Sequence, residues 1–234
     1  MVAELLRHEG RGHFVNERCE QCSADLPGGL GVRCDDCFDN ALYCMECVVD
    51  LHMRHPLHRP KVCRVSSPVF IYSCSTAYLP SQRWTGKYFS RVPLKLLGVR
   101  VQLGHRLGQI CPKSYSANAD VFIVIDVTGI HDVNVRFCGC EDAPPSYIQL
   151  LRARWYPSTC VEPHTVATFR LLEHYQLLAA NSKITDAEFY NSLAQVTDNT
   201  GLFPPPVSIH TTHPNFMCFL TDLTRIAMML SLAW

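Results

Sequence analysis

The second half of the chain has the clearest pattern of hydrophobic and polar positions. Residues 121–127 (VFIVIDV) form a short, nearly continuous apolar run, and residues 133–137 (VNVRF) alternate strictly between apolar and polar. Both patterns are typical of β-strands, and the intervening residues 128–131 (TGIH) supply a turn. We therefore predict a buried β-hairpin that pairs residues 121–127 with residues 133–137.

Two helices are predicted after this hairpin. Residues 165–180 (TVATFRLLEHYQLLAA) repeat apolar residues at intervals of three and four, which places them on one face of a helix. Thr185 and Glu188 have the spacing of a capping box, which opens a second helix over DAEFYNSLAQV. The order of these elements predicts a small mixed α+β domain with a central hairpin and C-terminal helices.

The N-terminal part has a different signature, made of cysteine and histidine. Three C-x2-C pairs follow one another and three histidines come after them: Cys19, Cys22, Cys34, Cys37, Cys44, Cys47, His52, His55 and His58. Eight ligands of this kind complete two tetrahedral zinc sites. Short intervals between such pairs are typical of a cross-brace, in which the first and third pairs share one ion and the second and fourth share the other. The spacing is similar to that of B-box and ZZ zinc fingers.

The cross-brace arrangement assigns the ligands to two ions. We expect one zinc at Cys19, Cys22, Cys44 and Cys47, and a second at Cys34, Cys37, His52 and His58. Pro56 makes a turn that lets His52 and His58 converge and leaves His55 outside. A pair made of His55 and His58 is also sterically feasible.

Four further residues around the predicted hairpin have ligand chemistry. His105 and Cys111 precede it, and Cys138 and Cys140 end it, with a glycine between them that permits a tight backbone. A third zinc at these four residues would clip the strand entering the hairpin to the strand leaving it. The alternative is buried unliganded thiols beside a surface histidine.

Composition favours an intracellular protein with metal-bound or reduced thiols. The chain has 234 residues, of which 47% are hydrophobic and 18% charged, with a formal net charge of zero. This length supports one or two domains with a real core. Thirteen cysteines, an odd number, and a charged segment over residues 1–18 argue against a secreted disulfide framework. No uninterrupted apolar run reaches the length of a membrane span, so we expect no membrane association.

The distribution of charge singles out residues 83–113, which carry seven basic side chains and no acidic one. Because nucleic-acid binding is driven by phosphate neutralisation and counterion release, this stretch is the candidate nucleic-acid surface. The residues that we expect to contact nucleic acid are Arg83, Lys87, Arg91, Lys95, Arg100 and Arg106. The alternative is a solvated basic face. Residues 1–61 carry ten acidic and seven basic side chains, which suits a basic peptide as partner.

Several strings resemble the CxC2-type cysteine cluster found on the N-terminal side of KDZ transposases, a group of mostly fungal DNA transposons. They cover about residues 19–206 and are RCDDC, YCMEC, HMRHPLHR, RWTGKYF, LKLLGVRVQLGH, CP, VFIVIDVTGIHDVNVRFCGC, QLLRARWYP, TFRLLEHY, ITDAEFYNSL and TDNTG. The resemblance implies a noncatalytic, zinc-binding, nuclear domain that normally precedes an RNase H-like transposase core and meets transposon ends or target DNA. It also favours His52 and His58 as ligands, because the family's last pair resembles H-x5-H with proline before the final ligand.

The chain departs from this pattern in two places. Removing residues 62–82 gives HRPKRWTGKYF, which restores the motif in register. The segment begins with Val-Cys, encodable by GTATGT, and ends in Gln, encodable by CAG, which are the two ends of a short intron. Residues 207–234 also depart from the family and begin with Val-Ser, encodable by GTAAGT. We interpret both as retained introns; the alternative is a genuine insertion and tail. The expected segments are 1–18 (N-terminal), 19–61 (zinc cross-brace), 62–82 (insertion or loop), 83–206 (α+β part) and 207–234 (aberrant tail).

These observations predict a noncatalytic zinc-binding domain that ends before the transposase core and serves DNA or protein interaction. We expect no enzyme activity, because the core needs a carboxylate triad that holds two divalent cations on a much longer chain. One alternative is a stand-alone B-box or ZZ-like protein-interaction module. The other is an RNase H-like nuclease in which Asp126, in a hydrophobic strand, is the first catalytic carboxylate.

Overall fold

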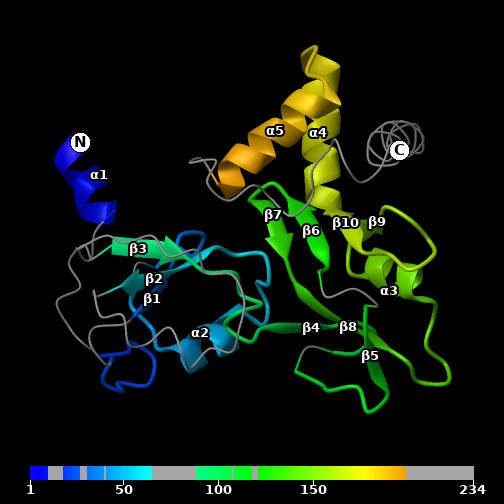
Figure 1. Ribbon diagram of the computed structural model, residues 1–234, viewed down its shortest axis with the longest axis horizontal. Helices are drawn as coiled ribbons and strands as arrows, with labels where there is room; N and C mark the ends of the chain where they lie inside the picture. Colours follow the sequence, from blue (N-terminus) through cyan, green and yellow to red (C-terminus); the bar gives the residue numbers. More distant parts are fainter. Residues whose placement is uncertain are drawn as a thin grey trace. The chain divides into compact units, whose positions relative to one another are not determined.

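The computed structural model describes residues 1–9, 18–26, 31–39, 41–64, 88–106, 108–117 and 121–198. The chain divides into two compact units. The first consists of Met1–His52 and His58–Leu97, and the second of Met53–Leu57 and Gly98–Trp234. Helices and strands are present in both (Figure 1), and the predicted mixed α+β class is confirmed. None of the helices in the described residues combines the length and apolar character needed to cross a bilayer.

The first unit is built on a small antiparallel sheet with strand order β1-β2-β3. Its elements are α1 (Val2–Glu9), β1 (Val32–Cys34), α2 (Met45–His52), β2 (Pro60–Arg64) and β3 (Tyr88–Arg91). Val62 lies at the centre of this sheet, paired with Val32 on one side and Ser90 on the other, and is 7% exposed. The predicted insertion at residues 62–82 therefore begins inside β2. Its first residue, Val62, supplies an apolar side chain to the sheet. Residues 65–82 and the tail at 207–234 lie outside the described residues.

Within the described residues, the second unit contains two sheets and three helices. The four-stranded sheet has the order β7-β6-β10-β9, and in the three-stranded sheet β8 lies between β4 and β5. In the first sheet β6 runs parallel to β10 and antiparallel to β7, and in the second β8 runs parallel to β4 and antiparallel to β5. The bounds are β4 Arg100–Gln102, β5 Ser114–Ser116, β6 Ile123–Asp126, β7 Gly129–Asp132, β8 Asn134–Cys138, α3 Ser146–Arg152, β9 Trp155–Pro157, β10 Thr165–Thr168, α4 Phe169–Asn181 and α5 Asp186–Thr197.

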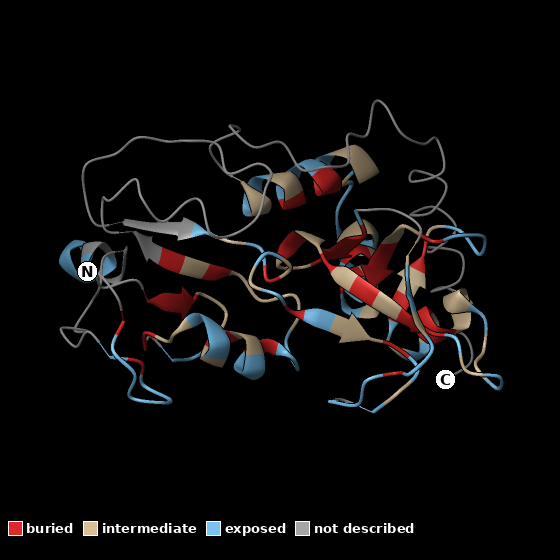
Figure 2. Cartoon of the chain, turned by 60° about the horizontal axis from the view of Figure 1, so that its bottom comes forward, coloured by how far each residue is buried: buried red, intermediate tan, exposed pale blue. Residues whose placement is uncertain are grey.

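Strand β6 is buried on both faces, which explains its continuous apolar sequence. Ile123 and Ile125 belong to a cluster that includes residues of α4 and α5, whereas Val124 belongs to a second cluster with residues of β8 and α3. Each of the three is at most 2% exposed. Figure 2 shows this strand and its neighbour β10 in the colour of buried residues. The unit is therefore organised around β6, with one apolar cluster on each side.

The predicted hairpin exists, but its second strand is not the predicted one. Strand β6 turns through two residues into β7, with Asp126 opposite Gly129, so residues predicted as turn form a strand. Residues 133–137 lie almost entirely in β8, which joins the other sheet. The predicted pairing is wrong because the chain reverses direction earlier than expected. Gly129, at φ +129°, permits a turn with only two residues between Asp126 and Gly129.

The first predicted helix begins later than its periodicity indicates. Thr165–Thr168 is strand β10, paired with β6 and β9, and α4 starts at Phe169. The helix prediction for these four residues is wrong, because Val166 and Ala167 fill the fully buried position beside β6. Thr168 caps α4 by accepting a hydrogen bond from the backbone N–H of Leu171. The capping box of α5, made by Thr185 and Glu188, is confirmed in both of its hydrogen bonds.

Replacing Gly129 with alanine should destabilise the second unit. A Cβ at this position would meet Thr197 Oγ1 at 2.8 Å, and the positive φ adds backbone strain. We expect Gly129→Ala to lower the free energy of unfolding by more than about 1 kcal/mol. Gly98→Ala is the matched control, because Gly98 also has a positive φ but its Cβ would meet nothing within 4 Å. Urea unfolding followed by circular dichroism measures both, and equal losses would contradict the role of the Thr197 contact.

Candidate metal centres

The first candidate centre is a group of four cysteines in the first unit. Cys19, Cys22, Cys44 and Cys47 have all their sulfur atoms within 4.8 Å of one another. The first two lie in a tight turn closed by a hydrogen bond from Cys19 N–H to the carbonyl of Ala24, 2.8 Å long. Cys44 and Cys47 lie at the start of α2, and Cys44 Sγ is 3.8 Å from Cys22 Sγ. The first and third C-x2-C pairs therefore converge.

Backbone groups around Cys19 favour the thiolate form of this one cysteine. Burial raises the pKa of the Cys19 thiol. Hydrogen bonds from the backbone N–H groups of Cys44, Cys22 and Gln21 have the larger combined effect and lower this pKa to about 6. Thiolates rather than thiols are metal ligands, so this environment prepares Cys19 for ligation.

The second candidate centre joins the second C-x2-C pair to two histidines. Cys34, Cys37, His52 and His58 form a group with ligand atoms within 4.8 Å of one another. Cys37 Sγ is 3.6 Å from His52 Nε2 and 3.4 Å from His58 Nδ1. The structure thus brings His52 and His58 to the cysteines, whereas His55 is exposed and belongs to none of the groups in the described residues.

Neighbouring residues orient the ligands of this second group. Nδ1 of His52 lies 2.9 Å from the carbonyl oxygen of Val48, so this nitrogen donates and Nε2 is left to face the cysteines. Asp36, between the two cysteines, accepts hydrogen bonds from the guanidinium and the backbone N–H of Arg59, which follows His58. These hydrogen bonds and the Arg59 charge outweigh the effect of burial and lower the pKa of Asp36. The contacts hold the Cys34–Cys37 turn against the chain that carries His58.

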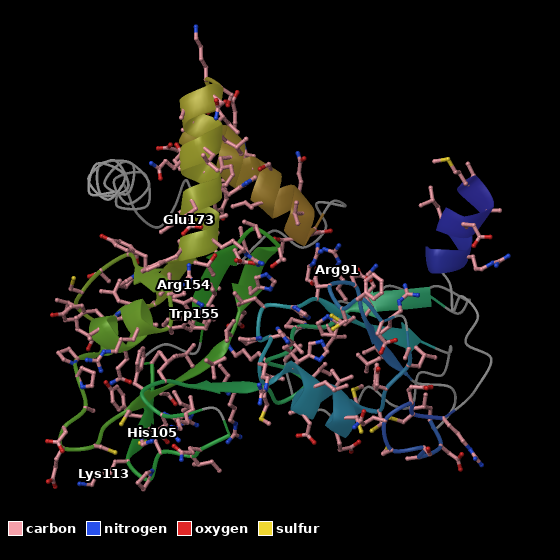
Figure 3. All side chains as sticks on the ribbon, turned by 180° about the vertical axis from the view of Figure 1, so that it is seen from behind. Arg91, His105, Lys113, Arg154, Trp155 and Glu173 are labelled. Carbon is pink, nitrogen blue, oxygen red and sulfur yellow. The ribbon has the colours of Figure 1, made fainter. Side chains whose placement is uncertain are left out.

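The third candidate centre lies in the second unit. His105, Cys111, Cys138 and Cys140 form a group with ligand atoms within 4.8 Å of one another. Cys111 Sγ is 3.7 Å from the sulfurs of both Cys138 and Cys140, and His105 Nε2 is 3.2 Å from Cys138 Sγ. Figure 3 shows His105 beside Lys113 at one end of the three-stranded sheet. Cys138 ends β8, so this group ties the loop between β4 and β5 to the central strand of that sheet.

Two residues allow the third group to assemble. Gly139 approaches the backbone of Lys113 so closely that a Cβ would lie 2.6 Å from its carbonyl oxygen. Gln149 of α3 is 2% exposed, accepts a hydrogen bond from Cys138 N–H and donates one to the Cys138 carbonyl, both 2.9 Å long. Gln149 therefore satisfies the buried backbone at a cysteine of the group. Sequence reasoning missed it, and the only signal was a single amide in the otherwise apolar stretch YIQLL of α3.

The distances within all three groups fit tetrahedral coordination. With metal–sulfur bonds of about 2.3 Å and metal–nitrogen bonds of about 2.05 Å, the tetrahedron has sulfur–sulfur edges of about 3.8 Å and sulfur–nitrogen edges of about 3.6 Å. The shortest sulfur–sulfur distances are 3.7–3.8 Å and the shortest sulfur–nitrogen distances are 3.2–3.8 Å, and all ligand atoms of each group lie within 4.8 Å of one another. A disulfide would need about 2.05 Å. All three groups could therefore hold a metal ion.

The residues predicted to contact nucleic acid fall into both units. Arg91 and Lys95 lie in the first unit, and Arg100 and Arg106 in the second. Arg91, Arg100 and Arg106 are exposed and Lys95 is half-buried. Arg83 and Lys87 lie outside the described residues.

Asp126, the candidate nuclease carboxylate, is fully engaged in hydrogen bonds. It is 1% exposed and accepts from the hydroxyl of Thr168 at 2.6 Å, the hydroxyl of Thr128 at 2.7 Å and the guanidinium of Arg170 at 2.5 Å. Burial raises the pKa of Asp126, but these hydrogen bonds lower it below its usual range. Asp126 is in none of the metal-capable groups found among the described residues. Its contacts join β6 to β10 and α4, which is a structural role.

Replacing Asp126 with asparagine should lower stability in a pH-dependent way. Because the folded-state pKa is lowered, the carboxylate stabilises the fold above its unfolded pKa of about 3.9, and this contribution is lost as the pH falls through the folded pKa. We expect Asp126→Asn to cost about 1.5–3 kcal/mol at pH 7 and progressively less below about pH 4. Urea unfolding of both proteins from pH 3 to pH 8 measures the difference. A loss that does not change with pH would contradict an ionised Asp126.

Comparison with known proteins gives a family match over part of the chain. A family model described as "CxC2 like cysteine cluster associated with KDZ transposases" matches residues 94–201. No curated protein and no solved structure matches the chain. The matched range contains all four residues of the third group and none of the first two groups. The resemblance predicted from the sequence is confirmed over this range, which is similar to the CxC2-like cysteine cluster associated with KDZ transposases.

Proposed function

We propose that the three groups hold structural zinc ions and that the first unit is a cross-brace finger similar to B-box and ZZ fingers. Thiolate and imidazole are the ligands of structural zinc, whereas calcium and magnesium require oxygen. Each group supplies four protein ligands, which leaves no open position for a substrate or a reactive water. Donor set and coordination number together support a structural role.

The small size of the apolar cluster around the first group supports the same proposal. The apolar cluster around the first group has only three fully buried members among the described residues, Cys19, Leu26 and Leu42, and one of these is a ligand candidate. Zinc binding to such small modules contributes on the order of 10–16 kcal/mol per site. Ligation would then supply much of the stability that the apolar core does not.

For the chain as a whole we propose a noncatalytic nuclear domain that serves a KDZ-type transposase by contacting transposon or target DNA. The observation that carries this proposal is the family match over residues 94–201, with a complete metal-capable group inside it. In this proposal the catalytic core belongs to a part of the transposase that follows this domain. Zinc maintains the fold, and the exposed surface makes the contacts.

A second candidate function, peptide binding, is favoured by the charges of the first unit. Its exposed side chains include the acids Glu20, Asp25, Asp39, Glu46 and Asp50. Two of its basic residues, Arg59 and Lys61, are paired with Asp36 and Asp35 at 2.6 and 2.7 Å, and Arg18 is paired with Asp25 at 3.0 Å. This charge pattern suits a basic peptide better than a phosphate backbone.

The zinc proposal predicts three bound ions. We expect native mass spectrometry of the full chain to find three zinc ions, with one lost in Cys44→Ser and one lost in Cys111→Ser. Cys160→Ser is the matched control and should retain all three, because Cys160 is exposed and lies outside the groups. A protein that melts cooperatively at the same temperature with and without chelator would contradict structural zinc.

The DNA proposal predicts weak, salt-dependent duplex binding. We expect the zinc-loaded chain to bind a 20-base-pair DNA duplex with a dissociation constant of about 10⁻⁴ to 10⁻⁶ M near physiological salt, and more tightly at lower salt. Fluorescence anisotropy at several salt concentrations measures this. Absence of binding at low salt, together with binding of a lysine-rich peptide, would replace the DNA proposal by the peptide-binding one.

A further inference from the structure

The three-stranded sheet of the second unit has one polar face, which follows from its register. On the opposite, apolar face, Val101 is paired with Val135, and Tyr115 with Phe137, whose rings stack with centroids 5.5 Å apart. Val135 and Phe137 belong to the apolar cluster shared with α3. Side chains alternate between the faces of a strand, so the intervening residues lie on the other face. This polar sheet face consists of Arg100, Gln102, Ser114, Ser116, Asn134 and Arg136, together with the buried Cys138 of the third metal-capable group.

The polar sheet face carries positive charge and no carboxylate. Arg100 is exposed and Arg136 is half-buried, and neither forms an ion pair with any described residue. The acids nearest in sequence flank β8: Asp132 precedes it in β7, and Glu141 follows it, 3.4 Å from Lys113. The two arginines on this face are therefore not neutralised within the described residues.

The third metal-capable group adjoins this face and would hold it rigid. Cys138 is the last residue of β8 and pairs with Ser114 of β5, whereas His105 follows β4 by three residues. Exposed Arg106 comes directly after His105. Figure 3 shows His105 and Lys113 at the same end of the sheet. An ion at this group would fix β8 and the loop between β4 and β5 relative to one another.

We propose that the polar sheet face binds the sugar–phosphate backbone of double-stranded DNA. Arginine, serine, asparagine and glutamine are the side chains that contact phosphates and position proteins on a duplex. The face has no aromatic side chain among its strand residues, so it lacks the stacking platform that binds unpaired bases. The choice of DNA as the ligand rests on the proposed function. The location of the binding surface, and its fit to a sugar–phosphate backbone, are inferred from the side chains of the sheet.

This surface differs from the basic stretch that the sequence indicates. Arg91 and Lys95 of that stretch belong to the first unit. Asn134 and Arg136 of the polar sheet face come from β8, which lies outside residues 83–113 in the sequence. Within residues 83–113, Arg100 and Gln102 belong to the polar sheet face, and Arg106 follows β4 by four residues. Among the described residues that we predicted to contact nucleic acid, only Arg100 lies on this face. Variants can therefore separate the two surfaces.

The test measures the salt dependence of DNA binding by the full zinc-loaded chain. With a fluorescent 20-base-pair duplex, we expect Arg100→Gln/Arg136→Gln to reduce the slope of log K against log salt by about 1.8, or about 0.9 for each lost phosphate contact. Arg100→Lys/Arg136→Lys should keep the slope. Arg152→Gln/Lys183→Gln is the matched control, because both side chains are exposed in the same unit but lie on α3 and after α4. It removes the same charge and should change the slope little. Metal content and circular dichroism establish that each variant is folded.

Three outcomes would overturn this inference. If Arg91→Gln/Lys95→Gln flattens the slope and the Arg100/Arg136 variant does not, DNA binding survives as the function but the surface is wrong. If the Arg152/Lys183 control has the same effect as the test variant, binding depends on net charge and not on this face. If an RNA duplex of the same sequence binds at least as tightly as the DNA duplex, the assignment to DNA is wrong. Absence of any nucleic-acid binding by the unmodified chain would instead remove the proposed function itself.

Discussion

The convergence of twelve cysteine and histidine side chains into three tetrahedral groups is the constraint on which the rest of the structure depends. In the first unit it connects a turn at residues 19–22 to the start of α2, and the end of β1 to both ends of the loop between His52 and His58. Sulfur and imidazole groups gathered this closely could hold a metal ion. Small sheets and short helices of this kind become stable folds when such ligation is added to a limited apolar core.

The second unit depends on a second constraint, the burial of β6 on both faces. Its apolar side chains alternate between two clusters, and its last residue, Asp126, connects three elements through charged hydrogen bonds. The third metal-capable group lies at the end of β8, whose side chains Val135 and Phe137 enter one of these clusters. Strand β8 therefore carries a cysteine of the metal-capable group at its end and packs its apolar face into the core. In the proposed DNA-binding role, an ion bound at this group would support the polar sheet face from the end of β8.

The sequence predicted local features well and long-range pairing poorly. The capping box at Thr185 and the strand character of 133–137 depend on neighbouring residues, and both are present in the structure. The spacing of cysteines and histidines named the three sets of side chains that the structure brings together, because C-x2-C and C-x-C are local geometries. The partner of β8 could not be predicted, since alternation reports a buried face but not which sheet supplies it. Gln149 was missed for the same reason, because its role lies in contacts with Cys138, eleven residues away.

The central claim, that thiolate and imidazole groups hold three zinc ions, is tested most directly by zinc X-ray absorption spectroscopy of the full-length protein. The first group has four cysteines, the second has two cysteines and two histidines, and the third has three cysteines and one histidine. Together they supply nine sulfur and three nitrogen ligands. The account predicts an average of about three sulfurs at about 2.3 Å and one nitrogen at about 2.0–2.1 Å per zinc. A spectrum dominated by oxygen or nitrogen, with fewer than about two sulfurs per ion, would contradict it.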